Sequence, residues 1–547
     1  MTMPFPNSMT PYPRRKLMNR AYARRLPTVE QIVTTAKQMQ AIESAMFAAG
    51  MPVAALMEKV AGKIAEWIEQ RFPRDRAPVV GVLVGPGHNG GDALVVAREL
   101  HHRGYQILLW CPFSRIKNLT AQHKAYLEYL NIRTTAISSD LNFCDLIVDG
   151  GFGVGLTRPL TGDLAEGIKA INATSIPVVS IDLPSGLATD TGAVLGTAIR
   201  ADHTLCLGLW KLGLLQDQAQ PWVGQLHLIP FDVPPAAVQS VLSENIVTRC
   251  ITPEAAIARL PLPRSPIAHK YKAGHVLLIA GSRQYGGAAL LCGHGAIASG
   301  VGMLTVVVPE SLRLMVLSQL PEALVMGAEE TPSGAIAAIP ELVEWSRYDV
   351  VACGPGLTPA AAPIVQAVMQ CDRPLVLDAD GLNILTQDDP IAQLQGRAAS
   401  TVLTPHPGEF RRLFPEQLAA AATPSLAAQQ AAQATQCTII LKGAMSAIAH
   451  PDGQLWINPE STPALARGGS GDVLTGLLAG LAAQLCHPAE GAADCVLNAA
   501  IAAVWWHAQT GRYLAAHRTD LGCAAHPLSQ ALPEALAERL AHYQAES

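Results

Sequence analysis

Short apolar runs rich in Val, Ile and Leu alternate with helical segments along most of this 547-residue chain. Apolar and polar residues hardly alternate within a run, which is typical of strands buried on both faces of a parallel sheet. Parallel strands are usually joined by a helix, so the pattern predicts doubly wound α/β architecture. The predicted strands are residues 79–85, 106–111, 146–149, 177–182 and 203–207, then 274–280, 303–308, 349–353, 374–378, 401–404 and 438–441, with a helix over 92–102 among the segments between them.

A proline-rich stretch over residues 231–263 interrupts this pattern and marks a domain boundary. The motifs differ on its two sides, so we predict two α/β domains and no internal repeat. The predicted parts are a basic tail (1–27), the two domains (28–235 and 245–520) and a C-terminal segment (521–547) with a surface helix over 533–543.

Composition narrows the partners and the compartment. The net charge is −5 and 49% of the residues are apolar, so we expect neither a nucleic-acid nor a membrane partner. The eleven cysteines include no CxxC pair, which favours the cytoplasm over a disulfide framework or structural zinc. The Pro-rich residues 1–27 indicate a disordered tail, the alternative being a transit peptide. The apolar stretch 492–506 is too short to span a bilayer and predicts a core helix.

A glycine-rich segment, residues 85–92, follows the first predicted strand and formally matches the GxGxxG dinucleotide fingerprint. Its glycines would let backbone N–H groups approach a phosphate at a helix N-terminus. A ribose-binding acid should follow about twenty residues later, but the second strand is followed by Pro112-Phe113-Ser114-Arg115. The glycines therefore indicate either a phosphate site of another kind or only a tight turn.

Oxygen-bearing side chains follow the next strands of the first half. Asp149 ends the third predicted strand, and Asp182 and Ser185 follow the fourth. Carboxyl ends of parallel strands meet at one edge of the sheet, where such folds bind ligands. Each acid alone fits a turn or a helix cap, but several at one edge favour a site. With Asn89, these hard oxygen donors suit a cation other than zinc.

The strongest motif of the second half is Arg467-Gly468-Gly469-Ser470-Gly471-Asp472, which opens a helix rich in Leu and Ala. The free N–H groups of that turn would stabilise a phosphoryl oxygen, with help from the helix dipole. Asp472 is placed to take a proton from a hydroxyl near the same phosphate. The alternative is an aspartate that only caps the helix.

Further loops follow strands and converge on the same edge. They are Gly354-Pro355-Gly356, residues 378–383, and Thr404-Pro405-His406-Pro407-Gly408-Glu409. A further strand ends at Leu441-Lys442, ahead of a predicted hairpin at Pro451-Asp452-Gly453. The alternative for His406 is a turn residue fixed between two prolines.

The first half resembles the YjeF-type N-terminal domain, the NAD(P)H-hydrate epimerase. Residues 84–92, 149–155 and 182–186 carry the resemblance, although His88 stands where that family usually has Asn. The resemblance implies a Rossmann-like three-layer α/β fold and a potassium ion held by Asn89, Asp149 and Ser185. It also implies that Asp182 moves protons at C6 of the hydrated nicotinamide ring. The residues implied to cradle the dinucleotide phosphates are His88, Asn89, Gly90, Gly91, Asp92, Gly153, Val154, Gly155, Leu156, Thr157, Arg158 and Pro159.

The second half resembles the NAD(P)H-hydrate dehydratase branch of the ribokinase-like α/β fold. The His-Pro-Gly-Glu motif at 406–409 carries this resemblance together with residues 269–274, 281–288 and 467–476. It implies that Asp472 deprotonates the C6 hydroxyl, which then attacks the terminal phosphate of ADP in the presence of Mg²⁺. The residues implied to bind nucleotide are Lys442, Gly443, Ala444, Met445, Ser446 and Gly471, and those implied to contact the hydrated cofactor are Ala288, Gly356, His406 and Asp472.

The two resemblances together span residues from about 33 to about 516. They imply a bifunctional enzyme that epimerises (R)- and (S)-NAD(P)H hydrate (NADHX and NADPHX). They also imply that it dehydrates the S epimer at the expense of ADP, giving AMP and phosphate. We expect a cytoplasmic homo-oligomer. The alternative is an ATP-dependent kinase of a small hydroxylated metabolite with an N-terminal binding or scaffold module. A plain NAD dehydrogenase would lack both its ribose acid and a hydride-transfer site.

Overall fold

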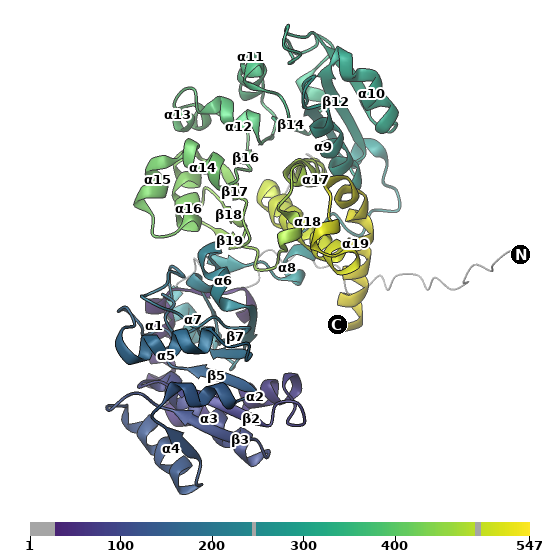
Figure 1. Ribbon diagram of the computed structural model, residues 1–547. Coiled ribbons are helices and arrows are strands. Elements are labelled where there is room, and N and C mark those ends of the chain that lie inside the picture. Colours follow the sequence, from purple (N-terminus) through teal and green to yellow (C-terminus); the bar gives the residue numbers. More distant parts are fainter. Residues whose placement is uncertain (1–27, 243–247, 487–493, 547) are drawn as a thin grey trace, which may run out of the picture.

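The computed structural model describes residues 28–242, 248–486 and 494–546, which form two α/β domains (Figure 1). The predicted tail, residues 1–27, lies outside the described residues. The two-domain α/β prediction is confirmed, because each half builds its own sheet. The exact domain boundaries stay predictions.

The N-terminal domain contains a seven-stranded sheet in which every neighbouring pair is parallel. The strand order β4-β3-β2-β5-β6-β7-β9 changes direction between β2 and β5. Open α/β sheets bind ligands at such a switch point. The strands are β2 (Val79–Val84), β3 (Gln106–Trp110), β4 (Arg133–Thr135), β5 (Leu146–Gly150), β6 (Val178–Ile181), β7 (His203–Leu207) and β9 (Gln225–Ile229).

Successive residues of a strand point to opposite faces of the sheet, and here both sets are apolar. Helices therefore cover both faces of the sheet. In β2, Val82 packs in one core with helices α1 to α3, whereas Leu83 packs in another core beneath α5. This gives the three layers that the resemblance implied. The helices are α1 (Ala36–Ala48), α2 (Val53–Arg71), α3 (His88–His102), α4 (Asn118–Tyr129), α5 (Gly162–Asn172), α6 (Gln220–Val223) and α7 (Pro235–Leu242).

The C-terminal domain contains a ten-stranded sheet of order β10-β19-β18-β17-β16-β15-β14-β11-β12-β13. Its switch point lies between β11 and β14. Only the β17-β18 and β18-β19 pairs are antiparallel, and the turn between β18 and β19 is the predicted hairpin. The strands are β10 (Thr248–Cys250), β11 (His275–Ile279), β12 (Met303–Pro309), β13 (Leu324–Ala328), β14 (Val350–Cys353), β15 (Leu375–Leu377), β16 (Thr401–Leu403), β17 (Thr438–Leu441), β18 (Ala447–Ala449) and β19 (Leu455–Ile457).

Two helical layers enclose this sheet as well (Figure 1). α17 packs against α9 and α18 on one face, and α11 to α16 lie on the other. The helices are α8 (Pro253–Ile257), α9 (Gly286–Ala298), α10 (Arg313–Gln319), α11 (Ala362–Met369), α12 (Asp380–Leu385), α13 (Pro390–Gln395), α14 (Pro407–Leu413), α15 (Pro415–Ala420), α16 (Pro424–Thr435), α17 (Ser470–Leu485), α18 (Cys495–Arg518) and α19 (Ala525–Glu546).

Three expectations need correction. The helix predicted over 92–102 begins earlier, at His88, so only residues 85–87 of the glycine-rich segment lie outside α3. The helix near the C-terminus is longer than predicted, and Leu528 and Leu532 are buried, so it is not simply a surface helix. A disulfide joins Cys486 and Cys495, because the end of α17 and the start of α18 bring these residues together.

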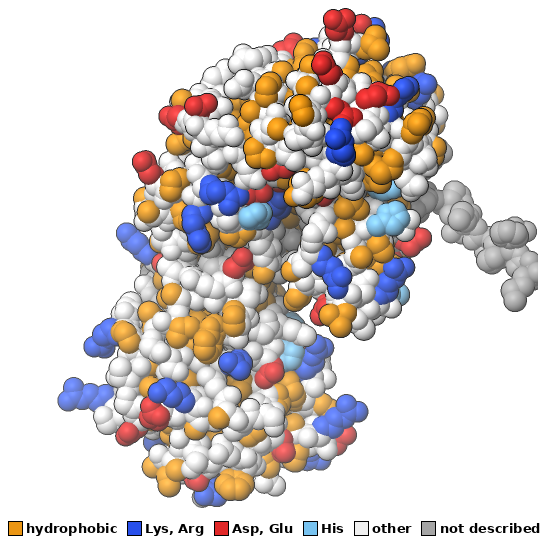
Figure 2. All heavy atoms as spheres, turned by 45° about the horizontal axis from the view of Figure 1, so that its top comes forward, with side chains coloured by type: hydrophobic (Ala, Val, Ile, Leu, Met, Phe, Trp, Pro, Cys, Tyr) orange, Lys and Arg blue, Asp and Glu red, His pale blue; other side chains and the backbone are white. Residues whose placement is uncertain are grey.

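No single helix among the described residues is long and apolar enough to cross a membrane; α1 and α2 pass that test only as a pair, bent by 119°. On the face drawn in Figure 2, basic and acidic side chains are interspersed among apolar and polar ones.

Candidate functional sites

A buried hydrogen-bond network occupies the switch point of the N-terminal sheet. Asp149, at the end of β5, is fully buried. Its Oδ1 accepts hydrogen bonds from Ser185 Oγ at 2.6 Å and Gly151 N at 3.1 Å, and its Oδ2 from Ser180 Oγ and Ser185 N at 2.8 Å each. Burial raises the pKa of Asp149, although these hydrogen bonds act in the opposite direction. The structure therefore brings Asp149 and Ser185 together, as predicted.

Asn89 and Asp182 lie across a glycine from each other. A Cβ atom added at Gly153 would lie 2.8 Å from Asp182 Oδ2 and 3.5 Å from Asn89 Oδ1. The Nδ2 atom of Asn89 is buried and has no hydrogen-bond partner among the described residues. Gly153 thus keeps open a small polar space between the two side chains, in which a ligand atom would meet both.

The other residues predicted to cradle the phosphates lie at the start of α3 and on the loop after β5. His88, Gly90, Gly91 and Asp92 lie in the first turn of α3, with His88 exposed and both glycines buried. The segment 153–159 is a partly exposed loop between β5 and α5. Gly153 lies beside Asn89. Gly155 and residues 157–159 are exposed.

Lys211 is a site residue that the sequence analysis missed. It lies on the short strand β8 (Trp210–Lys211), which pairs with β1 (Val33–Thr34). Its Nζ lies 2.5 Å from Asp182 Oδ1 and donates to Leu207 O at 2.5 Å. Burial is the largest single effect and would lower the pKa of Lys211, but the charge of Asp182, the neighbouring Cys206 and Glu43, and the hydrogen bond to Asp182 together raise that pKa. A single lysine within an apolar run was the available signal.

Two further carboxyl groups lie in the electrostatic field of this pair. Burial raises the pKa of Glu43, on α1, to about 7, with Lys211 opposing the shift and Asp182 adding to it. Burial, followed by the charges of Asp182 and Glu43, raises the pKa of Asp92 well above its usual value. Glu43 was also missed as a site residue, although residues 38–43 resemble an entry helix of the family, because no strand end or glycine turn lies beside it. The crevice can therefore hold protons on some carboxyl groups while Asp182 faces a cation.

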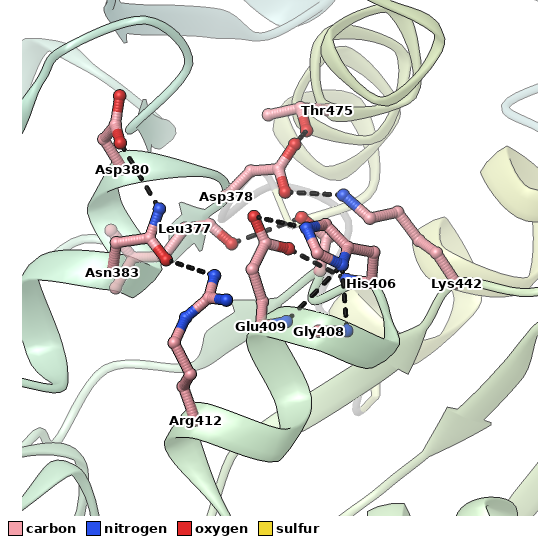
Figure 3. A network of polar contacts seen from close by, with 11 residues as sticks. Leu377, Asp378, Asp380, Asn383, His406, Gly408, Glu409, Arg412, Lys442 and Thr475 are labelled. Atoms are coloured by element: carbon pink, nitrogen blue, oxygen red, sulfur yellow. Dashed lines mark hydrogen bonds and ion pairs between the residues drawn. The ribbon is translucent and has the colours of Figure 1, made fainter. Parts of the chain in front are cut away.

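The second site lies at the opening of α17. Asp378, buried at the end of β15, accepts from Lys442 Nζ at 2.7 Å and from Thr475 Oγ1 at 2.7 Å (Figure 3). A Cβ atom added at Gly471 would lie 3.3 Å from Lys442 Nζ. The ammonium group therefore lies against the glycine turn predicted to bind phosphate. The segment 378–383 was expected at this edge of the sheet, but neither Asp378 nor Thr475 was predicted as a site residue.

A cavity of about 450 Å³ adjoins this turn. It lies at the switch point, where Gly356 has a φ of +70° and a Cβ atom added to it would lie 2.8 Å from Tyr285 O. The structure therefore brings Ala288, Gly356 and Asp472 to one cavity, as predicted. The lining residues are Gln284, Tyr285, Ala288, Gly356, Thr358, Pro359, Asp380 and Asp472.

Asp472 has the electrostatics of a proton acceptor. Burial, followed by the charge of Asp378, raises its pKa to about 7, while Lys442 opposes the shift. A general base works best with a pKa near the operating pH. Asp472 lies in the first turn of α17 but is not its N-cap, since Gly469 takes that position with a φ of +88°. The capping alternative is therefore not what the structure shows.

His406 is the N-cap of α14 and forms a capping box with Glu409. Its Nδ1 accepts from Gly408 N at 3.0 Å, and Glu409 Oε2 accepts from His406 N at 2.8 Å. His406 is not among the residues lining the 450 Å³ cavity. The turn role is thus observed, and because Nδ1 is an acceptor, the neutral ring carries its proton on Nε2, which lies 3.5 Å from Glu409 Oε1.

The predicted nucleotide segment 442–446 forms a tight loop after β17. Ser446 Oγ accepts from Gly443 N at 3.2 Å and donates to Gly443 O at 3.0 Å. Lys442 N donates to Pro405 O at 2.9 Å, which joins this loop to the one that carries His406. The loop therefore holds the Lys442 stem in place, with its ammonium at Gly471.

Within the described residues, no group of three or more His, Cys, Asp or Glu side chains could hold a metal ion. The predicted potassium ligands include only one carboxylate, so this finding does not test them. The atom of Asn89 that lacks a partner is Nδ2, an N–H donor, so a cation would be bound through Asn89 Oδ1 together with the buried oxygens of Asp149 and Ser185.

Comparison with known proteins matches the two halves to two families. Residues 53–213 match the family described as YjeF-related protein N-terminus, and residues 276–534 match the family described as NAD(P)H-hydrate dehydratase. The bifunctional NAD(P)H-hydrate repair enzyme Nnr of Thermosynechococcus vestitus is 53% identical over 91% of this chain and 95% of its own length. The protein of that name from Synechocystis sp. is 50% identical over 91% of this chain and 94% of its own.

Among solved structures, the ADP/ATP-dependent NAD(P)H-hydrate dehydratase from Bacillus subtilis, co-crystallised with ATP and Mg²⁺, is 34% identical. It covers 53% of this chain and 97% of its own, with a TM-score of 0.44.

Proposed function

The chain belongs to the family of bifunctional NAD(P)H-hydrate repair enzymes, and from that premise we propose how its two sites divide the work. Its N-terminal domain is the epimerase and its C-terminal domain is the ADP/ATP-dependent dehydratase. The enzyme interconverts the two C6 epimers of hydrated NADH or NADPH, and it dehydrates one epimer back to the intact cofactor.

In the epimerase site, Asp182 is the group that moves protons at the C6 carbinol while the ring opens and recloses. The observation that supports this role is its position, since its Oδ2 borders the open space beside Gly153 while its Oδ1 is held by Lys211. The Lys211 ammonium group pairs with this buried carboxylate and fixes the position of its Oδ1. The N-terminal turn of α3 and the loop 153–159 would bind the dinucleotide phosphates through backbone N–H groups.

In the dehydratase site, Asp472 removes the proton of the C6 hydroxyl, whose oxygen attacks the terminal phosphate of ADP and releases AMP. Loss of the phosphate from C6 and of a proton from C5 restores the ring double bond. The single observation that carries this assignment is Asp472, with its pKa near 7, in one cavity with Ala288 and Gly356. The exposed side chain of His406 would contact the hydrated cofactor from the neighbouring loop.

The nucleotide would lie along Lys442 to Ser446, with its phosphates at Gly471 and the Lys442 ammonium. Backbone N–H groups at the start of α17 would stabilise the charge that develops on the phosphoryl group. Mg²⁺ bound with the nucleotide would neutralise phosphate charge. ADP is the proposed donor, and parallel assays with ADP and ATP would decide the preference.

Potassium is proposed at Asn89, Asp149 and Ser185. Bound there, the ion would supply positive charge beside the buried Asp149 carboxylate. Its test is thermal denaturation in KCl against choline chloride, in which K⁺ should raise the Tm of the wild type more than that of Asn89→Ala. A cytoplasmic homo-oligomer also stays a proposal, which light scattering and cell fractionation would test.

The decisive experiment supplies a mixture of both NADPH hydrate epimers with ADP and Mg²⁺ and follows the return of reduced-nicotinamide absorbance. Wild type should convert the mixture fully. Asp472→Ala should convert none, and Asp182→Ala should stall once the directly usable epimer is consumed. No recovery with ADP or ATP would contradict the dehydratase role and favour the small-metabolite kinase.

A further inference from the structure

The N-terminal domain contacts the C-terminal domain beside the proposed nucleotide loop. The contact is made by residues 215–218, which lie between the last strands of the N-terminal domain, just before α6. Figure 1 shows α6 where the two domains meet. The epimerase domain is therefore a direct neighbour of the dehydratase machinery.

Asp217 bonds the backbone of the nucleotide loop. Its Oδ1 accepts a hydrogen bond from Met445 N at 2.7 Å. A Cβ atom added at Gly443 would lie 2.4 Å from Asp217 Oδ2, so the carboxylate also covers the Gly443 face of the loop. A carboxylate that binds a backbone N–H restricts the loop more strongly than a neutral acceptor would.

The side chain of Gln216 holds residues 215–218 in place. Its side chain is buried, and its Oε1 accepts from Ser425 Oγ, at the start of α16, at 3.0 Å. Its Nε2 donates to Leu212 O and Leu215 O at 3.0 Å each. Because this buried amide bonds to both domains, Asp217 is held in a defined position rather than on a free loop.

A cavity of about 260 Å³ lies between these elements. Apolar side chains of the C-terminal domain, among them Phe410 and Leu441, form about half of its wall, and residues 215–218 of the N-terminal domain close it. Its composition suits a flat, largely apolar ring with a few polar edges. The residues of the wall that such a ring would contact are Leu215, Gln216, Phe410, Leu418, Leu441 and Ala447.

Lys442 connects this cavity with the phosphate turn. It lines the cavity, while its Nζ bonds to Asp378 at 2.7 Å and lies 3.3 Å from a Cβ position on Gly471. A nucleotide with its phosphates at Gly471 would therefore extend along Lys442 and place its base end in the cavity.

We propose that the epimerase domain completes the nucleotide site of the dehydratase: Asp217 positions the loop 442–446, and residues 215–218 form one wall of the pocket that takes the purine base of the nucleoside diphosphate. This inference rests on the proposed binding of ADP at that loop. Asp217 is a positioning residue and takes no part in the chemistry.

The test is calorimetric titration of full-length Asp217→Ala with MgADP, together with steady-state kinetics. The Kd and KM for ADP should rise about three- to tenfold, the equivalent of one hydrogen bond. The kcat at saturating ADP, the KM for the hydrate and the epimerase rate should stay unchanged. Asp217→Asn keeps an acceptor oxygen and should bind MgADP more tightly than Asp217→Ala.

Asp190→Ala is the matched control, because Asp190 Oδ1 also accepts a backbone hydrogen bond, from Ala36 N at 2.6 Å, but within the N-terminal domain. An unchanged Kd in Asp217→Ala, or an equal rise of the Kd in Asp190→Ala, would overturn this inference but leave the proposed function standing. Wild-type protein that binds no MgADP would overturn the proposed function as well.

Discussion

The Nζ atom of Lys211 lies 2.5 Å from Oδ1 of Asp182, and both side chains are almost fully buried. Asp182 directly follows β6 and has a φ of +68°, a conformation that non-glycine residues adopt rarely and that functional sites often contain. That backbone conformation places the carboxylate between Lys211 and the open space beside Gly153. The pair therefore combines a buried charge with access to substrate.

Replacing Lys211 should abolish most epimerase activity. In Lys211→Met the buried Asp182 carboxylate loses the cation that holds its Oδ1, so the carboxylate should leave its position and epimerase kcat should fall about a hundredfold or more. Breaking a buried ion pair should also lower the free energy of unfolding by about 3–5 kcal/mol. Stopped assays of epimer composition and chemical denaturation measure the two effects.

The matched control is Lys59→Met, because Lys59 pairs with Asp232 at 2.5 Å but at the surface. Surface ion pairs contribute about 0–1 kcal/mol. Equal losses in the two variants would contradict a special role for Lys211.

Asp472→Asn should remove the proton acceptor of the dehydratase while keeping the anion-binding turn. Its dehydratase kcat should fall about 10²- to 10⁴-fold, with the Kd for MgADP little changed. Asp452→Asn, on the exposed turn between β18 and β19, should keep wild-type kinetics. Retention of more than a tenth of the wild-type kcat would show that another group takes the proton.

The dehydratase should depend on pH through Asp472. Its carboxylate form is the base, so kcat/KM should rise with pH and level off above about 7, the pKa of Asp472. A flat profile between pH 5.5 and pH 8 would exclude this role.

The thermal stability of the protein should also depend on pH through Asp472. The pKa of Asp472 is higher in the folded protein than its usual value of 3.8, so the neutral carboxyl favours folding below that value and this contribution is lost as the pH rises through about 7. Asp472→Asn stays neutral and should therefore raise the Tm more at pH 8 than at pH 5. Scanning calorimetry at the two pH values measures the difference.

Gly153→Ala should impair the epimerase through space alone. The added methyl would lie 2.8 Å from Asp182 Oδ2, so the carboxylate must move, and epimerase kcat/KM should fall about ten- to a hundredfold. Dehydratase kinetics should not change. Gly62→Ala on α2 is the control, since no atom lies within 4 Å of its added methyl.

Much of the architecture could be predicted because its signals are local. β7 and β17 have the predicted bounds, and β2, β5 and β11 differ from prediction by one or two residues. Their unbroken apolar character records burial on both faces. The edge strand β4, with its Arg133-Thr134-Thr135 sequence, was missed because exposed residues gave no apolar run.

The same locality explains which site residues were found. Asp149, Asp182 and Asp472 follow strands or open helices beside glycines, and such positions are visible in a linear motif. Lys211 and Glu43 belong to the crevice only because β8 and α1 fold back onto it. No motif beside either residue in the sequence predicts that it lies near Asp182.

The sequence by itself determined two α/β domains and the chemistry of their strand-end motifs, because periodicity and glycine turns act over a few residues. Only the tertiary structure decided that Lys211 neutralises Asp182 across 29 positions of chain and that Asp217 bonds Met445 across 228. Such contacts depend on how distant elements pack and on which charges become buried together. The contacts within the epimerase site and those between the two domains are such long-range contacts, which local sequence patterns do not predict.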